Sequence, residues 1–255
     1  MSILNEPLIV YMSLDDTKRV FANSIMDILE TNPDAFDDIN AMFNTEYTNK
    51  LVEYKHLFYE LQKAWGQTWD GLCGGYLFNG RAYVYDHESY EKQELLFQKA
   101  KLANTVCEVG SYVGHSLFIM LLANPDLQIT SIDIANKYTG PAVELLNKHF
   151  HNRIRFIHAD SLTGLQMLTD EGKKFDLFHL DGDHTESLII SEYGMCSRMS
   201  SSFPRVKIVF DDEISLRGFT QYLINFRANL KLEIPNCEWS NIYIEFDEPE
   251  IRRNH

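Results

Sequence analysis

Two short segments constrain the fold of this chain more than any other feature. Residues 105–115, TVCEVGSYVGH, are an apolar run that ends in an acid and is followed by a turn with two glycines, Gly110 and Gly114. Residues 175–184, FDLFHLDGDH, are a buried-strand pattern that ends in acids and a histidine. Glycine allows positive φ and close backbone approach, and the free N–H groups of a following helix can face a ligand. Together the segments predict a ligand loop and a reactive cluster at one edge of a sheet.

Strands and helices alternate along the rest of the chain, which predicts an α/β fold with a doubly wound sheet. The expected strands are 105–109, 128–132, 154–158, 175–180 and 206–210, and the expected helices are 91–102, 116–123, 141–147, 161–168, 188–199 and 216–229. Right-handed crossovers would make these strands parallel, with ligands at their carboxyl ends. Segments 231–235 and 239–246 predict a terminal hairpin. The hairpin completes a seven-stranded, mostly parallel sheet with an antiparallel C-terminal strand.

Three parts of the chain are expected. Residues 1–90 form an N-terminal helical extension with a substrate or lid loop, because apolar residues recur at helical spacing up to about residue 66 and a glycine-rich stretch follows. Residues 91–248 form the cofactor-binding catalytic domain, and residues 249–255 form a tail. The extension packs on the main domain or on a second subunit, so a homodimer is one possible assembly.

Composition narrows the classes of function and location. The chain has 255 residues, 45% of them hydrophobic, which suffices for a full core. Its four cysteines have no paired spacing, so we expect reduced thiols rather than disulfides or a zinc site. The net charge of −14 argues against nucleic acid as a partner. No signal peptide or membrane span is evident, so we expect a cytoplasmic protein without a membrane partner.

Acids that follow the first three predicted strands indicate the ligand. The loop spacing Glu108-x-Gly110-x-x-x-Gly114 differs from the Gly-x-Gly-x-x-Gly of dinucleotide sites. Asp133 ends the second strand, where a carboxylate can accept hydrogen bonds from both hydroxyls of a ribose. Asp160 ends the third strand, beside the place that an adenine ring would occupy. Acids suit an adenosine with a positively charged appendage better than a pyrophosphate, which they would repel. Each acid alone could equally be a helix N-cap.

These segments resemble class I S-adenosylmethionine-dependent methyltransferases over roughly residues 94–246. The resemblance implies the Rossmann-like methyltransferase fold and S-adenosylmethionine as cofactor. It also implies that Glu108 lies near the methionine part, that Asp133 holds the ribose and that Asp160 meets the adenine amine. The full set of residues expected around the cofactor is Glu108, Gly110, Ser111, Tyr112, Gly114, Ser116, Asp133, Ile134, Asp160, Ser161 and Asp181.

A second group of acids follows the fourth and fifth predicted strands: Asp181, Asp211 and Asp212. Crowded carboxylates raise each other's pKa, and a divalent cation such as Mg²⁺ relieves that repulsion. The cation would acidify a substrate hydroxyl, and a neutral His184 could remove its proton before attack on the methyl group. Helix capping is the alternative for Asp211 and Asp212, and a hydrogen bond in the cofactor pocket is the alternative for His184. Asp183 is expected to support the turn.

The DGDH segment and the following DD pair are similar to metal-dependent O-methyltransferases, particularly the macrocin type acting on sugar hydroxyls and, more distantly, catechol O-methyltransferase. The resemblance implies Asp181, Asp211 and Asp212 as metal ligands and His184 as the base, with Asp181 also in the catalytic set. Catechol-type enzymes carry Asp-Asn after strand five, whereas this chain has Asp-Asp. We therefore expect methylation of a hydroxyl on a carbohydrate or other small molecule, assisted by Mg²⁺ or a similar cation.

Three other functions stay open on sequence grounds. Metal-independent transfer to nitrogen or to a carboxyl group would leave activity intact in chelator. A dinucleotide-dependent oxidoreductase or epimerase would bind NAD, although the missing third glycine and the closing hairpin speak against it. A non-catalytic adenosine-binding subunit would bind the cofactor without turnover. His158 and His179 lie inside apolar strands and are expected to be core histidines.

Overall fold

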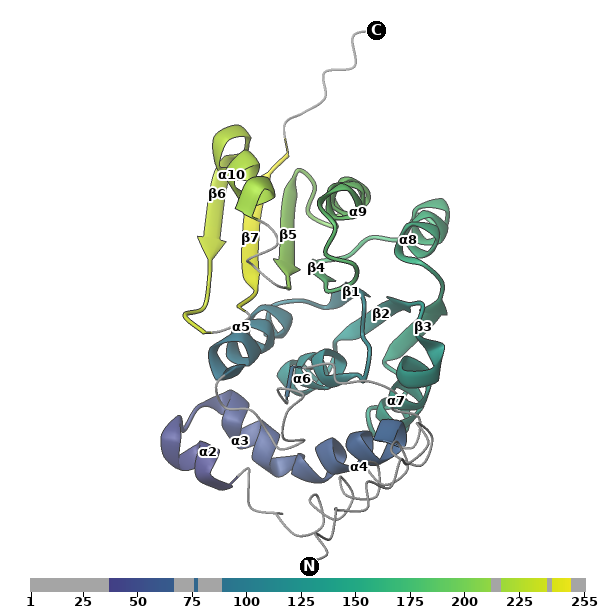
Figure 1. Cartoon of the computed structure of the whole chain (residues 1–255), viewed down its shortest axis with the longest axis vertical. Helices are drawn as coiled ribbons and strands as arrows, with labels where there is room; N and C mark the ends of the chain where they lie inside the picture. Colours follow the sequence, from purple (N-terminus) through teal and green to yellow (C-terminus); the bar gives the residue numbers. More distant parts are fainter. Residues whose placement is uncertain (1–36, 67–75, 78–88, 212–216, 238–239, 249–255) are drawn as a thin grey trace, which may run out of the picture.

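The structure, a computed structural model, describes residues 37–66, 76–77, 89–211, 217–237 and 240–248. Its centre is a seven-stranded sheet with the order β3-β2-β1-β4-β5-β7-β6 (Figure 1). The strands are β1 (Thr105–Val109), β2 (Gln128–Asp133), β3 (Ile154–His158), β4 (Leu177–Leu180), β5 (Arg205–Phe210), β6 (Ala228–Glu233) and β7 (Ile242–Asp247). The described helices are α2 (Asp37–Met42), α3 (Glu46–Glu53), α4 (Lys55–Gly66), α5 (Tyr90–Lys101), α6 (His115–Ala123), α7 (Asn136–His149), α8 (Ser161–Asp170), α9 (Glu186–Arg198) and α10 (Arg217–Phe226).

The pairing of the strands confirms the predicted fold class. Strands β3, β2, β1, β4 and β5 run parallel to one another, as expected for strands joined by helical crossovers. Strand β7 pairs antiparallel with both β5 and β6, so the predicted terminal hairpin is confirmed. The carboxyl ends of β1 to β5 therefore meet at one edge of the sheet, which is where ligands bind in such folds.

Some predicted boundaries are wrong for identifiable reasons. Helix α7 begins at Asn136 rather than at Pro141, which lies inside it. A proline is favoured in a first turn, but here the Thr139 hydroxyl donates to Asp133 at 2.9 Å and holds an earlier turn against the sheet. The last predicted helix was expected to continue to residue 229, whereas the structure starts β6 at Ala228. Strand β4 starts two residues later than expected.

Two apolar layers cover the two faces of the sheet. Helices α5, α6 and α7 lie on one face, with α3 and α4 packed outside them, and α8, α9 and α10 lie on the other (Figure 1). Side chains alternate between faces along a strand. Leu177 of β4 lies in the first core and Phe178 in the second, so His179 and Asp181 belong to the face covered by α5 and α6. This alternation of side chains between the two faces therefore determines that α5 and α6, rather than α8 to α10, pack over His179 and Asp181.

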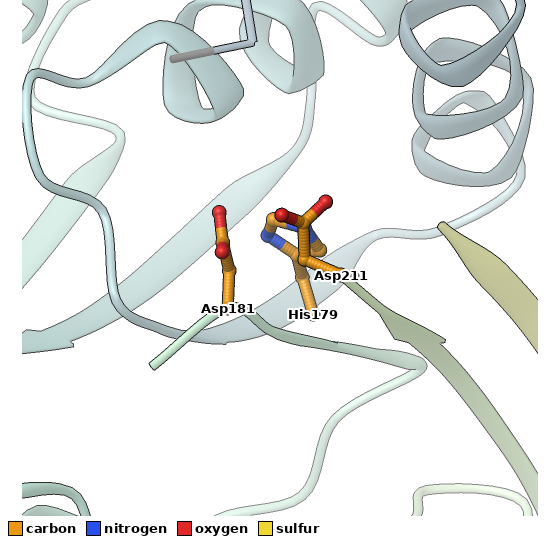
Figure 2. Close-up of side chains that lie close together, drawn as sticks. All are labelled: His179, Asp181 and Asp211. Carbon is orange, nitrogen blue, oxygen red and sulfur yellow. The ribbon is translucent and has the colours of Figure 1, made fainter. Parts of the chain in front are cut away.

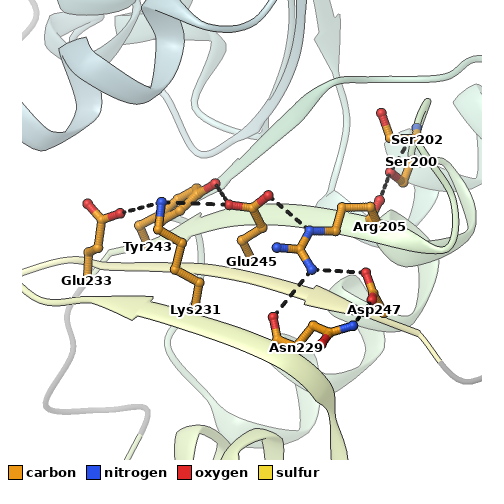
Figure 3. A network of polar contacts seen from close by, with 9 residues as sticks. All are labelled: Ser200, Ser202, Arg205, Asn229, Lys231, Glu233, Tyr243, Glu245 and Asp247. Atoms are coloured by element: carbon orange, nitrogen blue, oxygen red, sulfur yellow. Dashed lines mark hydrogen bonds and ion pairs between the residues drawn. The ribbon is translucent and has the colours of Figure 1, made fainter.

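A network of polar side chains links β5 to the hairpin formed by β6 and β7 (Figure 3). The Arg205 side chain donates to Glu245 at 2.9 Å and to Asp247 at 3.0 Å, both on β7. Tyr243 donates to Glu245 at 3.0 Å on the same face. These cross-strand pairs fix the register that brings Asn241, just before β7, to the end of β5.

Among the described helices, none has the length and apolar character needed to cross a bilayer.

Candidate functional site

The glycine loop after β1 is packed directly against the end of β4. Gly110 has φ +80°, and a Cβ there would lie 2.0 Å from the carbonyl oxygen of Asp181. Gly114 has φ +81° and precedes α6, where a Cβ would lie 2.8 Å from Cβ of Ala142. Ser116 is buried in the first turn of α6. Glycine is required at both turn positions because no other residue combines that φ with so little space. The loop and the acid motif of β4 thus form one site.

Asp133 is buried at the end of β2 and holds the loop in place. Its Oδ2 accepts hydrogen bonds from the N–H groups of Ser111 at 2.8 Å and Tyr112 at 2.7 Å and from the Thr139 hydroxyl. Its Oδ1 accepts one from the N–H of Ala135 at 2.6 Å. Each carboxylate oxygen has two lone pairs, and Oδ1 accepts a single hydrogen bond among the described residues, so Oδ1 keeps capacity for one further donor. The role of Asp133 toward a ribose stays a prediction, beside an observed role in shaping the loop.

The ends of β2 and β3 carry three more predicted cofactor residues. Asp160 is exposed and caps α8 by accepting from the N–H of Thr163 at 3.0 Å. Its hydrogen bonds to Thr163 lower the pKa of Asp160. Ile134 is 72% exposed, an apolar side chain that a flat ring could cover, and Ser161 is half-buried. The expectation of a core position for His158 is wrong, because it is exposed and its Nε2 lies 3.2 Å from the carbonyl oxygen of Ile134.

A fully buried polar chain runs beneath the loop. Glu108 accepts from the Ser111 hydroxyl through one carboxylate oxygen, and its Oε1 lies 2.9 Å from Nδ1 of His179. Nε2 of His179 lies 2.8 Å from the hydroxyl of Tyr76, which accepts from the Asn241 side chain at 3.1 Å. Glu108 and His179 are register neighbours on β1 and β4. Both ring nitrogens of His179 are therefore engaged, and the expectation of a satisfied core histidine is confirmed.

Three potential metal ligands gather at the carboxyl ends of β4 and β5. One ligand atom each of His179, Asp181 and Asp211 lies within 4.8 Å of the others, and Figure 2 shows both carboxylates beside the imidazole. Asp211 is buried, and its Oδ1 forms an ion pair of 2.6 Å with the ammonium of Lys92, which is also buried. The convergence predicted for Asp181 and Asp211 is confirmed. Asp212 lies outside the described residues.

The two carboxylates of this cluster differ in their pKa values. Burial raises the pKa of Asp181 well above its ordinary value, and the nearby charge of Asp211 raises it further. Burial alone would also raise the pKa of Asp211, but the Lys92 ammonium outweighs it and holds the pKa of Asp211 below its ordinary value. Of the two carboxylates, Asp181 is thus the one whose ionised form is not stabilised enough by nearby positive charge to offset its burial.

The donor set fits a divalent cation. Asp181 and Asp211 supply carboxylate oxygens, the ligand type that Mg²⁺ prefers, and the crowding of their charges is the condition that a cation relieves. His179 fits less well, because a metal on its ring would replace the hydrogen bond to Tyr76 or to Glu108. Among the described residues, the carboxylates that a cation could use here are therefore those of Asp181 and Asp211.

His184, the predicted base, lies on the loop after β4. It is half-buried and lines a small hollow together with Asp211 and Glu192. Asp183 beside it is exposed and accepts from the N–H of Thr185 at 2.8 Å, so it supports the turn as expected. The structure places His184 at the same edge as the acids, and its part in proton transfer stays a prediction.

Four buried residues around this site were not found from the sequence. Lys92 lies in the first turn of α5, and Tyr76 precedes that helix by several residues. Asn241 precedes β7, and Glu192 lies in the second turn of α9. None of these residues belongs to a chemical motif of the sequence, so no spacing pattern marks it. Their positions follow from packing across distant parts of the chain.

A comparison with protein families finds a match to the segment that carries this edge of the sheet. Residues 107–212 match the family described as "Methyltransferase domain". Over these residues the chain is therefore similar to methyltransferase domains. The matched segment begins within β1 and ends just after β5, so it contains the glycine loop and the acids that follow β2, β3, β4 and β5.

Two curated proteins of Arabidopsis thaliana are similar in sequence. The chain is 35% identical over 155 residues to a protein that carries the name caffeoyl-CoA O-methyltransferase, covering 56% of this chain and 66% of that protein. It is 34% identical over 93 residues to tapetum-specific methyltransferase 1, covering 35% of this chain and 40% of that protein. The chain thus spans less than two thirds of the length of either relative.

Solved structures share the fold. The O-methyltransferase from Bacillus cereus, in complex with S-adenosylhomocysteine, superposes with a TM-score of 0.57 at 13% identity over 76% of this chain and 91% of that one. The O-methyltransferase TomG from Streptomyces achromogenes, in complex with S-adenosylmethionine, gives 0.57 at 16% identity over 76% and 90%. The predicted Rossmann-like methyltransferase fold is confirmed. The segment that matches the methyltransferase domain lies within this shared fold.

Proposed function

We propose that this chain transfers the methyl group of S-adenosylmethionine to a hydroxyl oxygen of a carbohydrate or other small molecule, with assistance from a divalent cation. The observation that carries the proposal is the contact of Gly110 with the backbone of Asp181. That contact joins a loop suited to an adenosyl cofactor to a carboxylate cluster suited to a reacting hydroxyl. The O-methyltransferase names of similar proteins support oxygen as the acceptor atom.

The cofactor would lie across the carboxyl ends of β1, β2 and β3. The open capacity of Asp133 Oδ1 suits a ribose hydroxyl, and the exposed Ile134 suits one face of the adenine ring. Asp160 and Ser161 lie beside that place, at the start of α8. The sulfonium would face Asp181, whose carboxylate lacks positive charge. Attraction between opposite charges in a poorly solvated pocket then orients the methyl group toward the acceptor.

The reaction joins the acceptor oxygen to the methyl carbon while the carbon–sulfur bond breaks and its electron pair stays on sulfur, giving S-adenosylhomocysteine. An imidazole nitrogen of His184 takes the hydroxyl proton. A cation held by Asp181 and Asp211 would supply Lewis acidity that lowers the pKa of the acceptor hydroxyl. Holding the two reactants in line can contribute about 7–11 kcal/mol by itself. Positioning by the loop and the acids is therefore the main contribution of the protein.

The composition of the chain supports the acceptor and the cellular setting that we propose. A cluster of carboxylates in a chain of net charge −14 disfavours nucleic acid and favours a small polar acceptor, such as a glycan hydroxyl. The three described cysteines are free thiols, in keeping with a reducing, cytoplasmic setting. We also propose that the helices before α5 serve as the substrate-proximal extension or as a homodimer contact.

Calorimetry with S-adenosylmethionine, with and without Mg²⁺ and in chelator, followed by a product screen over glycan and small hydroxylated acceptors, tests this proposal. His184→Ala should keep cofactor affinity and lose turnover by about 10²–10⁴-fold. The control is His149→Ala, a histidine on α7 that pairs with Glu60 at the surface. Unchanged turnover in His184→Ala would remove the base from the mechanism. NAD binding in place of S-adenosylmethionine binding would overturn the assignment as a whole.

A further inference from the structure

Lys92 places a protein cation inside the carboxylate cluster. Its ammonium lies 2.6 Å from Oδ1 of Asp211, and both side chains are about nine-tenths buried. The same ammonium lies 4.3 Å from the centre of the Tyr76 ring. The side chain of Gln93, next to Lys92 on α5, donates to the carbonyl oxygen of Tyr76 at 2.6 Å. Helix α5 and Tyr76 thus hold the lysine at the ends of β4 and β5.

One ammonium and one divalent cation cannot both lie against Asp211 without strong repulsion. Coulomb energy rises steeply at short separation in a buried site, and like charges there are poorly screened. A metal that uses Asp211 together with Asp181 would therefore have to displace Lys92. The Tyr76 ring stabilises the ammonium where it now lies, because an aromatic face attracts a cation, so displacement would also lose that contact.

We propose that Lys92 is a built-in competitor of the divalent cation, so that its ion pair with Asp211 sets the metal affinity of the site. This inference rests on the proposed function, because it concerns the same carboxylates. Lys92 is a positioning residue here: without metal its ion pair holds the Asp211 carboxylate in place, and metal binding exchanges one cation for another.

The test compares Mn²⁺ binding by the full chain, measured by calorimetry without S-adenosylmethionine, in three variants and the wild type. Lys92→Met removes the charge and keeps most of the volume, and should bind Mn²⁺ about 10–100-fold more tightly. Lys92→Arg keeps the charge and should bind as weakly as the wild type. Lys99→Met is the matched control: Lys99 lies two turns along α5, forms a 2.6 Å ion pair with Glu233 and lies 4.0 Å from the ring centre of Tyr243.

A second measurement uses only the wild-type protein, in case Lys92→Met fails to fold. Acetylation of lysines by acetic anhydride, read by mass spectrometry, should modify the buried Lys92 slowly without metal and faster with saturating Mn²⁺. Modification of the partly exposed Lys50 should not change. Equal or weaker Mn²⁺ binding by Lys92→Met, or Lys92 labelling that Mn²⁺ leaves unchanged, would overturn the inference. S-adenosylmethionine binding by the same samples reports separately on the proposed function.

Discussion

Glu192 gives a sharp test of the electrostatics of this edge, because it is an acid buried without full compensation. It is 1% exposed on α9, and its Oε1 has no hydrogen-bond partner among the described residues. Burial, opposed in part by a hydrogen bond with Ser161 and assisted by the charge of Asp183, raises the pKa of Glu192 from 4.5 to about 6. The fold therefore makes ionisation of Glu192 less favourable than it is in the unfolded chain.

The sign and size of the effect follow from linkage. A carboxyl whose pKa is higher in the folded state than in the unfolded state makes folding most favourable below the unfolded value, and stability falls as pH rises from about 4.5 to about 6. One pKa unit corresponds to about 1.36 kcal/mol, so ionised Glu192 lowers the free energy of unfolding by about 2 kcal/mol relative to its protonated form. Glu192→Gln keeps the shape and cannot ionise. It should stabilise the protein by about 2 kcal/mol at pH 7.5 and by less than about 0.5 kcal/mol near pH 4.5.

Urea unfolding followed by circular dichroism at pH 7.5 and 4.5 measures both differences. Glu144→Gln, on the exposed face of α7, is the control and should change the free energy of unfolding by less than about 0.5 kcal/mol at either pH. A Glu192→Gln stabilisation of the same size at both pH values would show that the effect is not due to the buried charge. A loss of stability at pH 7.5 would refute the reasoning outright.

Three further substitutions test the geometry of the loop and its support. Gly110→Ala puts a Cβ at φ +80° and 2.0 Å from the Asp181 carbonyl oxygen, so we expect a loss of about 2–5 kcal/mol in urea unfolding, and wild-type stability would contradict the packing. Gly164→Ala, usually favourable within a helix, should instead lower stability by about 1–3 kcal/mol because its Cβ would lie 2.5 Å from Cγ2 of Ile132; a higher melting temperature would count against this contact. Asp133→Ala leaves buried loop N–H groups without an acceptor, so calorimetry should show weakened S-adenosylmethionine binding and unfolding should show a loss of about 2–4 kcal/mol; unchanged affinity would remove Asp133 from the cofactor site.

Local patterns were enough to predict most of the scaffold. Apolar runs bounded by turn residues located β1 and β3 with the observed bounds and placed the other strands within a few residues. The glycines of the loop, together with acids after successive strands, predicted the edge at which the site lies. Boundaries that depend on a distant contact could not be found in this way, as in α7, whose first turn is held by Asp133.

The groups that contact each acidic side chain were decided by tertiary packing. Asp133 was expected to face a ribose, and most of its hydrogen-bonding capacity serves the loop that it supports. Asp181 and Asp211 were expected to share a metal, and the structure adds the ammonium of Lys92 to that cluster. Hydrogen-bond partners that are far apart along the chain leave no periodic signal, so sequence reasoning finds the acid and misses its partner.

The order of polar and apolar residues already determined the alternation of strands and helices. It also determined which edge of the sheet holds the site and which residue types lie there. Both follow from the sequence because the two-residue period of strands and the turns at glycine are properties of local backbone geometry. The folded molecule alone decided which charges meet. Lys92 and Asp211 are 119 positions apart, and only the crossing of α5 over the ends of β4 and β5 brings a cation to that carboxylate. Electrostatic energy depends on distance and burial in space, and neither quantity is written in the spacing of residues along the chain.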